Sequence, residues 1–141
     1  MGNKKRKSGR KRAAIILLND EKILIIRRFK NGKQYFVIPG GGVKKKETPK
    51  EAALREMKEE TNLDVVIERK FHVFKNEGNP EYYYLSTRFS GTMQFGGPEL
   101  KKINENNLFH LEWISFTELV EINLYPDEIK QKILQELAHN S

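Results

Sequence analysis

The chain has 141 residues, a formal net charge of +7 and no cysteine. A chain of this length corresponds to about one domain and can bury a hydrophobic core of its own. The lack of cysteine excludes disulfides, zinc–thiolate sites and cysteine nucleophiles.

The positive charge is concentrated at the N-terminus. Residues 1–12 hold seven of the 26 basic residues and no acidic residue, and in the rest of the chain basic residues equal the 19 acidic ones. Such a segment is typically a disordered, solvated terminus, and a basic arm can also bind nucleic acid. We therefore predict a basic, disordered arm at residues 1–12 and a single folded domain at residues 13–141, with RNA as an alternative partner of the arm.

The segment after the arm does not look like a targeting signal. The apolar run Ala13–Leu18 is shorter than the core of a signal peptide, and no small-residue cleavage site follows it. No stretch approaches the length of a membrane-spanning helix. The sequence thus predicts a soluble, cytoplasmic protein with no membrane partner.

The sequence predicts short strands joined by turns in the first third of the domain. Apolar β-branched runs around polar turns indicate buried strands in a hairpin, and Asn-Gly accepts the positive φ of a tight turn. In chain order these are strand Ala13–Leu18, turn Asn19–Lys22, strand Ile23–Ile26, turn Lys30–Lys33 and strand Tyr35–Ile38, which Pro39-Gly40-Gly41-Gly42 ends.

A helix follows with clear boundary signals. Thr48-Pro49-Lys50-Glu51 has the pattern of a capping box, with proline at the first helical position. The predicted helix runs over Pro49–Thr61, and Asn62 suits the left-handed position after it.

The second half of the chain mixes strands with helices, which is typical of an α/β domain. The final helix has Ile129, Ile133 and Leu137 on one stripe. The predicted elements are strands Val65–Phe74 and Tyr82–Phe89, a loop from Gly96 to about Asn107, strand His110–Ile114, a short helix capped by Ser115 and reaching Val120, and a helix starting at Pro126.

Three carboxylates gather on one side of the predicted helix. Glu56, Glu59 and Glu60 share an arc of about 100° at helical spacing. Like charges four residues apart destabilise a helix, so the cluster calls for a cation. Oxygen ligands without histidine or cysteine suit Mg²⁺, with Mn²⁺ as the alternative. We also expect Arg55 to pair with Glu47 and hold the glycine segment against the helix.

These residues resemble the signature of the Nudix hydrolase family. Gly41 is followed by Glu47 and then by the run Arg55–Leu63, with Glu56, Glu59 and Glu60 at the family's charged positions. Asn62 stands where the family has glycine, and asparagine also suits this helix-capping position.

The resemblance implies an α/β/α sandwich with a mixed β-sheet and Mg²⁺-dependent cleavage of a nucleoside diphosphate linked to another group. It implies that Glu56, Glu59, Glu60 and the carbonyl of Gly40 bind the metal. It further implies that Glu47 and Arg55 orient the loop and that Gly41 lies at the substrate.

Two further roles follow from the same resemblance. The resemblance implies that Arg28 contacts phosphate, because MutT-like relatives have an arginine at the end of this strand. Arg27 and Arg28 point to opposite faces of the strand, so only one of them can face the site. The proton of the attacking water goes to a glutamate of the signature or to Glu99 in a later loop, with Glu105 as the second choice there.

The leading hypothesis is a MutT-like pyrophosphohydrolase of nucleoside triphosphates, because the chain is short and has no accessory domain. Hydrolysis of ADP-ribose, another nucleotide sugar or a dinucleoside polyphosphate is the first alternative. RNA 5′-end processing or RNA binding through the basic arm is the second. A non-enzymatic sensor is disfavoured because the three glutamates are intact.

Overall fold

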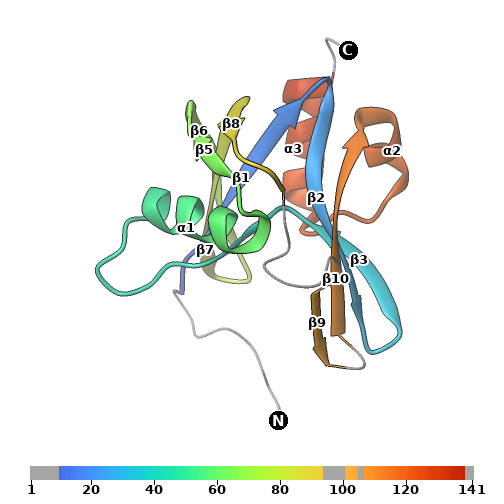
Figure 1. The fold of residues 1–141 in the computed structure, drawn as a ribbon, viewed down its shortest axis with the longest axis horizontal. Helices are drawn as coiled ribbons and strands as arrows, with labels where there is room; N and C mark the ends of the chain where they lie inside the picture. The colour runs from blue at the N-terminus through green and yellow to red at the C-terminus, as the bar shows by residue number, and fades with distance from the viewer. Residues whose placement is uncertain (1–9, 94–100, 105–106, 139–141) are drawn as a thin grey trace.

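The computed structural model describes residues 10–93, 101–104 and 107–138 of the chain. Their arrangement is shown in Figure 1. The elements in order are β1 (Arg12–Asn19), β2 (Lys22–Lys30), β3 (Lys33–Val37), β4 (Gly40–Gly42), α1 (Pro49–Thr61), β5 (Asp64–Val66), β6 (Arg69–Asn76), β7 (Asn79–Ser86), β8 (Arg88–Ser90), β9 (Lys101–Asn104), β10 (Asn107–Ser115), α2 (Phe116–Glu121) and α3 (Asp127–Leu137).

The main sheet is mixed. Its strands follow the order β6-β7-β1-β2-β10-β9, with β3 paired to β2 and β4 paired to β1. The β1–β7 pair is parallel, and the other pairs in this sheet are antiparallel. Strands β5 and β8 form a separate two-stranded sheet.

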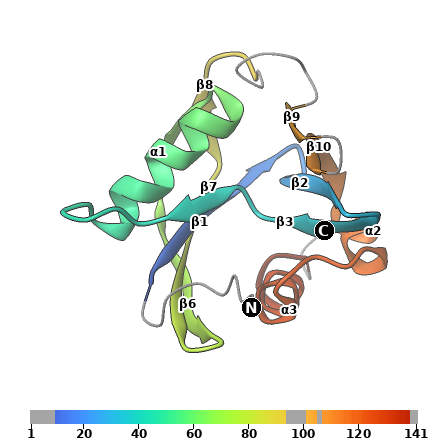
Figure 2. The ribbon, with the colours of Figure 1, turned by 90° about the horizontal axis from the view of Figure 1, so that it is seen from below.

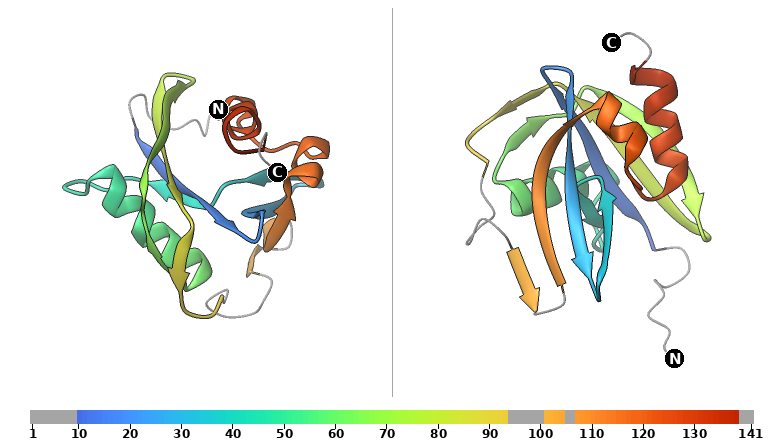
Figure 3. Two further views of the ribbon diagram at one scale, coloured as in Figure 1. Left: turned by 90° about the horizontal axis from the view of Figure 1, so that it is seen from above. Right: turned by 90° about the vertical axis from the view of Figure 1, so that its right-hand side faces the viewer.

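Strands β1 and β2 diverge soon after the turn that joins them. They pair only at Leu18–Ile23 and Asn19–Lys22. Further along, β2 pairs with β3 and β1 pairs with β4, so the segment 33–42 fills the wedge between the two strands. Two views of this part of the sheet are given in Figure 3. The wedge brings the glycine segment onto the edge of β1.

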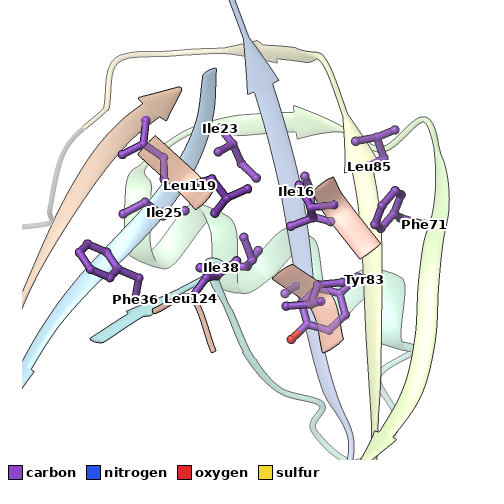
Figure 4. Packing of buried hydrophobic residues seen from close by; sticks show 14 of the residues in the cluster. Ile16, Ile23, Ile25, Phe36, Ile38, Phe71, Tyr83, Leu85, Leu119 and Leu124 are labelled. Carbon is purple, nitrogen blue, oxygen red and sulfur yellow. The ribbon is translucent and has the colours of Figure 1, made fainter. Parts of the chain in front are cut away.

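Helices cover both faces of the sheet. Figure 2 shows α1 on one side and α2 and α3 on the other. Alternate residues of β1 and β2 enter two core clusters: Ile16 and Ile25 pack on the α3 side, whereas Ile15 and Leu24 pack on the α1 side. Figure 4 shows the α3-side cluster. The chain thus has the predicted α/β/α sandwich.

The structure confirms the helix caps and tight turns that the sequence predicts. Thr48 caps α1 in a capping box with Glu51, and Asn62 ends the helix with a left-handed φ of 69°. The turn between β1 and β2 and the Asn31-Gly32 turn both use positive φ values. Ser115 caps α2, again in a capping box.

Two predicted strands are each broken in two. The stretch 65–74 is divided between β5 and β6, and the stretch 82–89 is divided between β7 and β8. The breaks face each other, because the Glu68 carboxylate accepts hydrogen bonds from the amide and the hydroxyl of Thr87. This contact lies at the junction between the small β5–β8 sheet and the main one.

Other differences from the sequence prediction are smaller. Strand β9 lies within the stretch predicted as a loop, and it pairs with β10, which is longer than predicted. The glycines that were expected to end a strand form β4 instead. Helix α3 begins at Asp127, with Pro126 as its cap.

The fold begins before residue 13. Arg12 is the first residue of β1, where it lies opposite Gly42 and Glu81. The backbone amide of Arg10 donates to Asn79 Oδ1 at 3.1 Å. The last part of the predicted basic arm is therefore joined to the sheet, and residues 1–9 lie outside the described residues.

Across the described ranges, no helix is both long and apolar enough to cross a membrane.

The Thr48 cap gives a test of how α1 is held. Thr48→Ala should lower the free energy of unfolding by about 1 kcal/mol, because the Glu51 amide loses its side-chain acceptor. Thr48→Ser keeps the hydroxyl and should cost much less. Urea denaturation of both variants checks this, and equal losses would contradict a hydrogen-bonding role for the hydroxyl.

Candidate functional site

Helix α1 carries its charged residues along the edge of its buried face. Ala52, Ala53, Met57 and Thr61 are buried against the sheet. Ala52 is fully buried, and its small side chain allows the helix to lie close to the sheet. Glu56 and Glu60 are half-buried, while Glu59 is exposed.

Arg55 connects the helix to the loop before it. Its guanidinium makes five hydrogen bonds, which matches the number of N–H groups it has. Two go to the Glu47 carboxylate at 2.7 and 3.0 Å, and one goes to the Gly42 carbonyl at 3.0 Å. The others reach Glu56 at 3.0 Å and Glu59 at 3.3 Å. The predicted Arg55–Glu47 pair is present.

This pairing changes the acidity of both partners. The hydrogen bonds from the Arg55 side chain and from the Lys44 amide lower the pKa of Glu47 from 4.5 to about 2. The hydrogen bonds to Glu47 raise the pKa of Arg55. The loop is therefore anchored by an ion pair that stays charged at neutral pH.

The glycine segment lies against the helix carboxylates. A β-carbon at Gly41 would collide with the Glu56 carboxyl group, and one at Gly40 would collide with the backbone of Ala13 and Ala14. Any other residue at Gly40 would push the segment away from β1, and one at Gly41 would displace the Glu56 carboxyl group. The close approach of this backbone to a carboxylate is a specific feature of the site.

Within the part of the chain that the structure describes, Glu60 has one carboxylate oxygen that no donor reaches. Its Oε1 atom is buried and has no hydrogen-bond partner. Burial, and then the nearby charge of Glu56, raise the pKa of Glu60 to about 8, although the charges of Arg12 and Arg28 and the Gly40 amide oppose this shift. A buried acceptor without a donor is costly, so this oxygen is suited to a bound cation.

The three predicted metal ligands do not form one ready-made cluster. Among the described residues, no three histidine, cysteine, aspartate or glutamate side chains are grouped closely enough to hold a metal. The reason is that Arg55 holds Glu56 and Glu59, whereas Glu60 faces a cavity that Gly40 also lines. That the three converge on a cation stays a prediction.

The donor set nevertheless fits a hard cation. The orphaned Glu60 oxygen lies on the same helix as the two carboxylates, and all the candidate ligands are oxygen atoms. In this arrangement Arg55 provides the positive charge that Glu56 and Glu59 need.

A cavity of about 440 Å³ opens at the wedge between β1 and β2. Its walls come from β1, β2, β3, α1, the β6–β7 turn and the segment before α3. The polar and aromatic lining residues are Arg12, Arg28, Tyr35, Glu60, Asn76, Glu77, Asn79, Glu81 and Tyr125. The carboxylates of Glu60, Glu77 and Glu81 and two guanidinium groups thus share one cavity.

The two neighbouring arginines of β2 lie on different sides. Arg28 lines the cavity and lies 5.9 Å from the Phe109 ring centroid. Arg27 instead forms an ion pair with Glu112 of β10. The alternation along the strand therefore places the predicted substrate-binding arginine, Arg28, beside Glu60.

Several lining residues were not predicted from the sequence. Arg12 was assigned to the arm, although its position next to the first apolar strand is a signal that it could join the sheet. Tyr35 and Tyr125 carry no motif, and their proximity depends on hydrogen bonds between Phe36 and the segment 123–125. Glu99 and Glu105, the candidate proton acceptors of a later loop, lie outside the described residues.

Comparison with known proteins gives a consistent picture. The NUDIX domain family profile matches residues 9–137. Solved structures with a similar fold include MutT in a study of Aliivibrio salmonicida and Vibrio cholerae (TM-score 0.71, 23% identity, 91% of this chain and 99% of the other). Another is the E. coli ORF135 protein (TM-score 0.71, 21% identity, 95% of this chain and 95% of the other). A third is the MutT NUDIX hydrolase from Burkholderia pseudomallei (TM-score 0.72, 20% identity, 93% of this chain and 99% of the other). No curated protein matches the sequence.

The Glu47–Arg55 pair predicts a defined pH dependence of stability. The pKa of Glu47 is lower in the folded protein than its ordinary value of 4.5, so the pair stabilises the fold above pH 4.5, and this contribution is lost as the pH falls toward about 2. Glu47→Gln should therefore be less stable than the wild type at pH 7, with a difference that shrinks below pH 4.5. Chemical denaturation at several pH values measures it, and a difference that persists undiminished at pH 2 would contradict the assignment.

Proposed function

Because the chain belongs to the Nudix family of hydrolases, we propose that it is a Mg²⁺-dependent pyrophosphohydrolase that cleaves a nucleoside triphosphate into a nucleoside monophosphate and pyrophosphate. The observation that carries the proposal is the buried, unpartnered oxygen of Glu60 in a cavity that it shares with Arg28. A guanidinium group suited to phosphate and a carboxylate suited to a metal ion line the same cavity, which supports the proposal. The site is proposed to work inside the cytoplasm.

Glu56, Glu59, Glu60 and the Gly40 carbonyl would hold the metal. When bound, the ion neutralises diphosphate oxygens and makes a water molecule more acidic. The protein's own residues do the remaining work. Arg28 binds a phosphate oxygen, and Arg55 with Glu47 keeps the Gly41–Gly42 backbone close to Glu56. Glu56, Glu59 and Glu99 are the candidates for accepting the proton of the attacking water.

The nucleoside end of the substrate is assigned to the mouth of the cavity. Tyr35 and Tyr125 line this cavity and also a neighbouring one of about 710 Å³. Tyr125 is 50% exposed, so its ring is accessible to a ligand. Aromatic rings at the entrance to a phosphate-binding cavity are suited to stacking on a planar base.

The first experiment is an activity panel with Mg²⁺. Wild type and Glu59→Gln are incubated with nucleoside triphosphates, ADP-ribose, nucleotide sugars, dinucleoside polyphosphates and 5′-triphosphorylated RNA, and the products are identified. We expect pyrophosphate release from a nucleoside triphosphate and a loss of about 100-fold or more in Glu59→Gln. The matched control is Glu136→Gln, which removes one charge from α3, where Glu136 pairs with Lys132.

The panel also separates the alternatives. Cleavage confined to ADP-ribose, nucleotide sugars or dinucleoside polyphosphates would replace the triphosphate assignment. Cleavage of RNA alone would assign the substrate to RNA 5′ ends. If the wild type cleaves none of these compounds, the proposed activity is wrong.

A second prediction concerns the base. Tyr125→Ala should raise KM for the preferred nucleotide by about tenfold with little change in kcat, because base–aromatic stacking contributes about 1–3 kcal/mol. Tyr125→Phe keeps the ring and should resemble the wild type. Steady-state kinetics measures both, and an unchanged KM in Tyr125→Ala would place the base elsewhere.

A further inference from the structure

The side chain of Arg12 crosses from β1 to the start of the glycine segment. Its Nη2 atom donates to the carbonyl of Ile38 at 2.9 Å. Ile38 precedes Pro39-Gly40, and its own side chain is buried in the core cluster shown in Figure 4. Both the side chain and the carbonyl of Ile38 are therefore held in place.

The other end of the same segment is held in a similar way. Arg55 Nη2 donates to the Gly42 carbonyl at 3.0 Å. Between the two arginines, the Ile15 amide donates to the Pro39 carbonyl at 3.2 Å. The segment Ile38–Gly42 is thus fixed on both sides of Gly40, whose amide faces the Glu60 carboxylate.

A buried polar network lies below Arg12. Glu81, which is opposite Arg12 in the β1–β7 register, is only 3% exposed. Its carboxylate accepts from the Tyr83 hydroxyl at 2.7 Å and from Asn76 Nδ2 at 3.0 Å. The guanidinium of Arg12 also reaches the Tyr83 hydroxyl. A buried carboxylate needs donors and a positive partner, so this network limits the directions that Arg12 can take.

We propose that Arg12 is a positioning residue of the site: by holding the Ile38 carbonyl, it sets the orientation of the Gly40 peptide beside Glu60. The inference rests on the proposed function in one respect, namely that Gly40 and Glu60 belong to the metal site. Arg12 acts on the cation through the backbone, and its guanidinium is committed to the Ile38 carbonyl and Tyr83. Arg28, by contrast, is assigned to the substrate.

The test compares four variants with the wild type. Arg12→Gln removes the guanidinium, Arg12→Lys keeps the charge without the planar fork, and Tyr83→Phe removes only the hydroxyl. Lys11→Gln is the control, because it removes the same charge from the exposed neighbouring side chain. The measurements are Mn²⁺ affinity by electron paramagnetic resonance without nucleotide, kcat and KM with the preferred nucleotide, and Tm.

We expect Arg12→Gln to weaken Mn²⁺ binding and to lower kcat, each by about 10–100-fold, which is typical when a group that orients a metal ligand is removed. KM for the nucleotide should change little. Arg12→Lys should recover part of the loss, because an ammonium group cannot reproduce the guanidinium geometry. Tyr83→Phe should have a smaller effect in the same direction, and Lys11→Gln should have none.

Three results would overturn the proposal. A rise in KM with unchanged kcat would show that Arg12 binds substrate directly. A lower Tm with unchanged Mn²⁺ affinity and kcat would show that it serves only the fold. No Mn²⁺ binding by the wild type would remove the site itself. If the wild type hydrolyses no compound of the panel but Arg12→Gln still weakens Mn²⁺ binding, the positioning role stands and only the proposed activity fails.

Discussion

Strands β1 and β2 separate after two paired positions, and the rest of the site depends on that separation. The wedge gives the segment 33–42 room to pair first with β2 and then with β1. Pro39, which has no N–H to donate, lies between the two pairings. As a result, the glycine backbone reaches helix α1, and a cavity opens between the strand that carries Arg12 and the strand that carries Arg28. A hairpin that stayed paired along its length would close this space.

The arginines at and near the site have different partners. Arg55 uses its donors on Glu47, Glu56, Glu59 and the Gly42 carbonyl, so loop and helix are joined through one planar group. A fork of five donors suits this role better than the point charge of a lysine. Glu60 is excluded from this arrangement and keeps a bare oxygen in the cavity. Arg55 thus neutralises Glu56 and Glu59, whereas Glu60 keeps an oxygen that no donor reaches.

The sequence was informative wherever the chemistry is local. The capping box at Thr48 and the left-handed position of Asn62 each depend on neighbouring residues, and both were predicted correctly. The strand breaks near Glu68 and Thr87 depend on a contact between residues 19 apart, which no local pattern reveals. The same holds for Arg12, whose role depends on pairing with residues more than 20 positions away. Periodicity gives faces and ends of elements, but it does not tell which strand lies beside which.

Local sequence patterns do not reveal contacts between distant strands. For this reason the family signature could be predicted and the cavity walls could not. The signature occupies one loop and one helix, so its spacing alone brings Arg55 to Glu47. The opposite wall is assembled from β1, the β6–β7 turn and the segment before α3, which meet only after the sheet has formed. In this fold the residues proposed to hold a cation lie in one loop and one helix, whereas those proposed to contact a base, Tyr35 and Tyr125, come from distant segments. The type of reaction is consequently easier to predict from the sequence than the substrate. The residues that indicate the reaction lie in one loop and one helix, whereas the substrate-binding walls depend on the arrangement of the whole sheet.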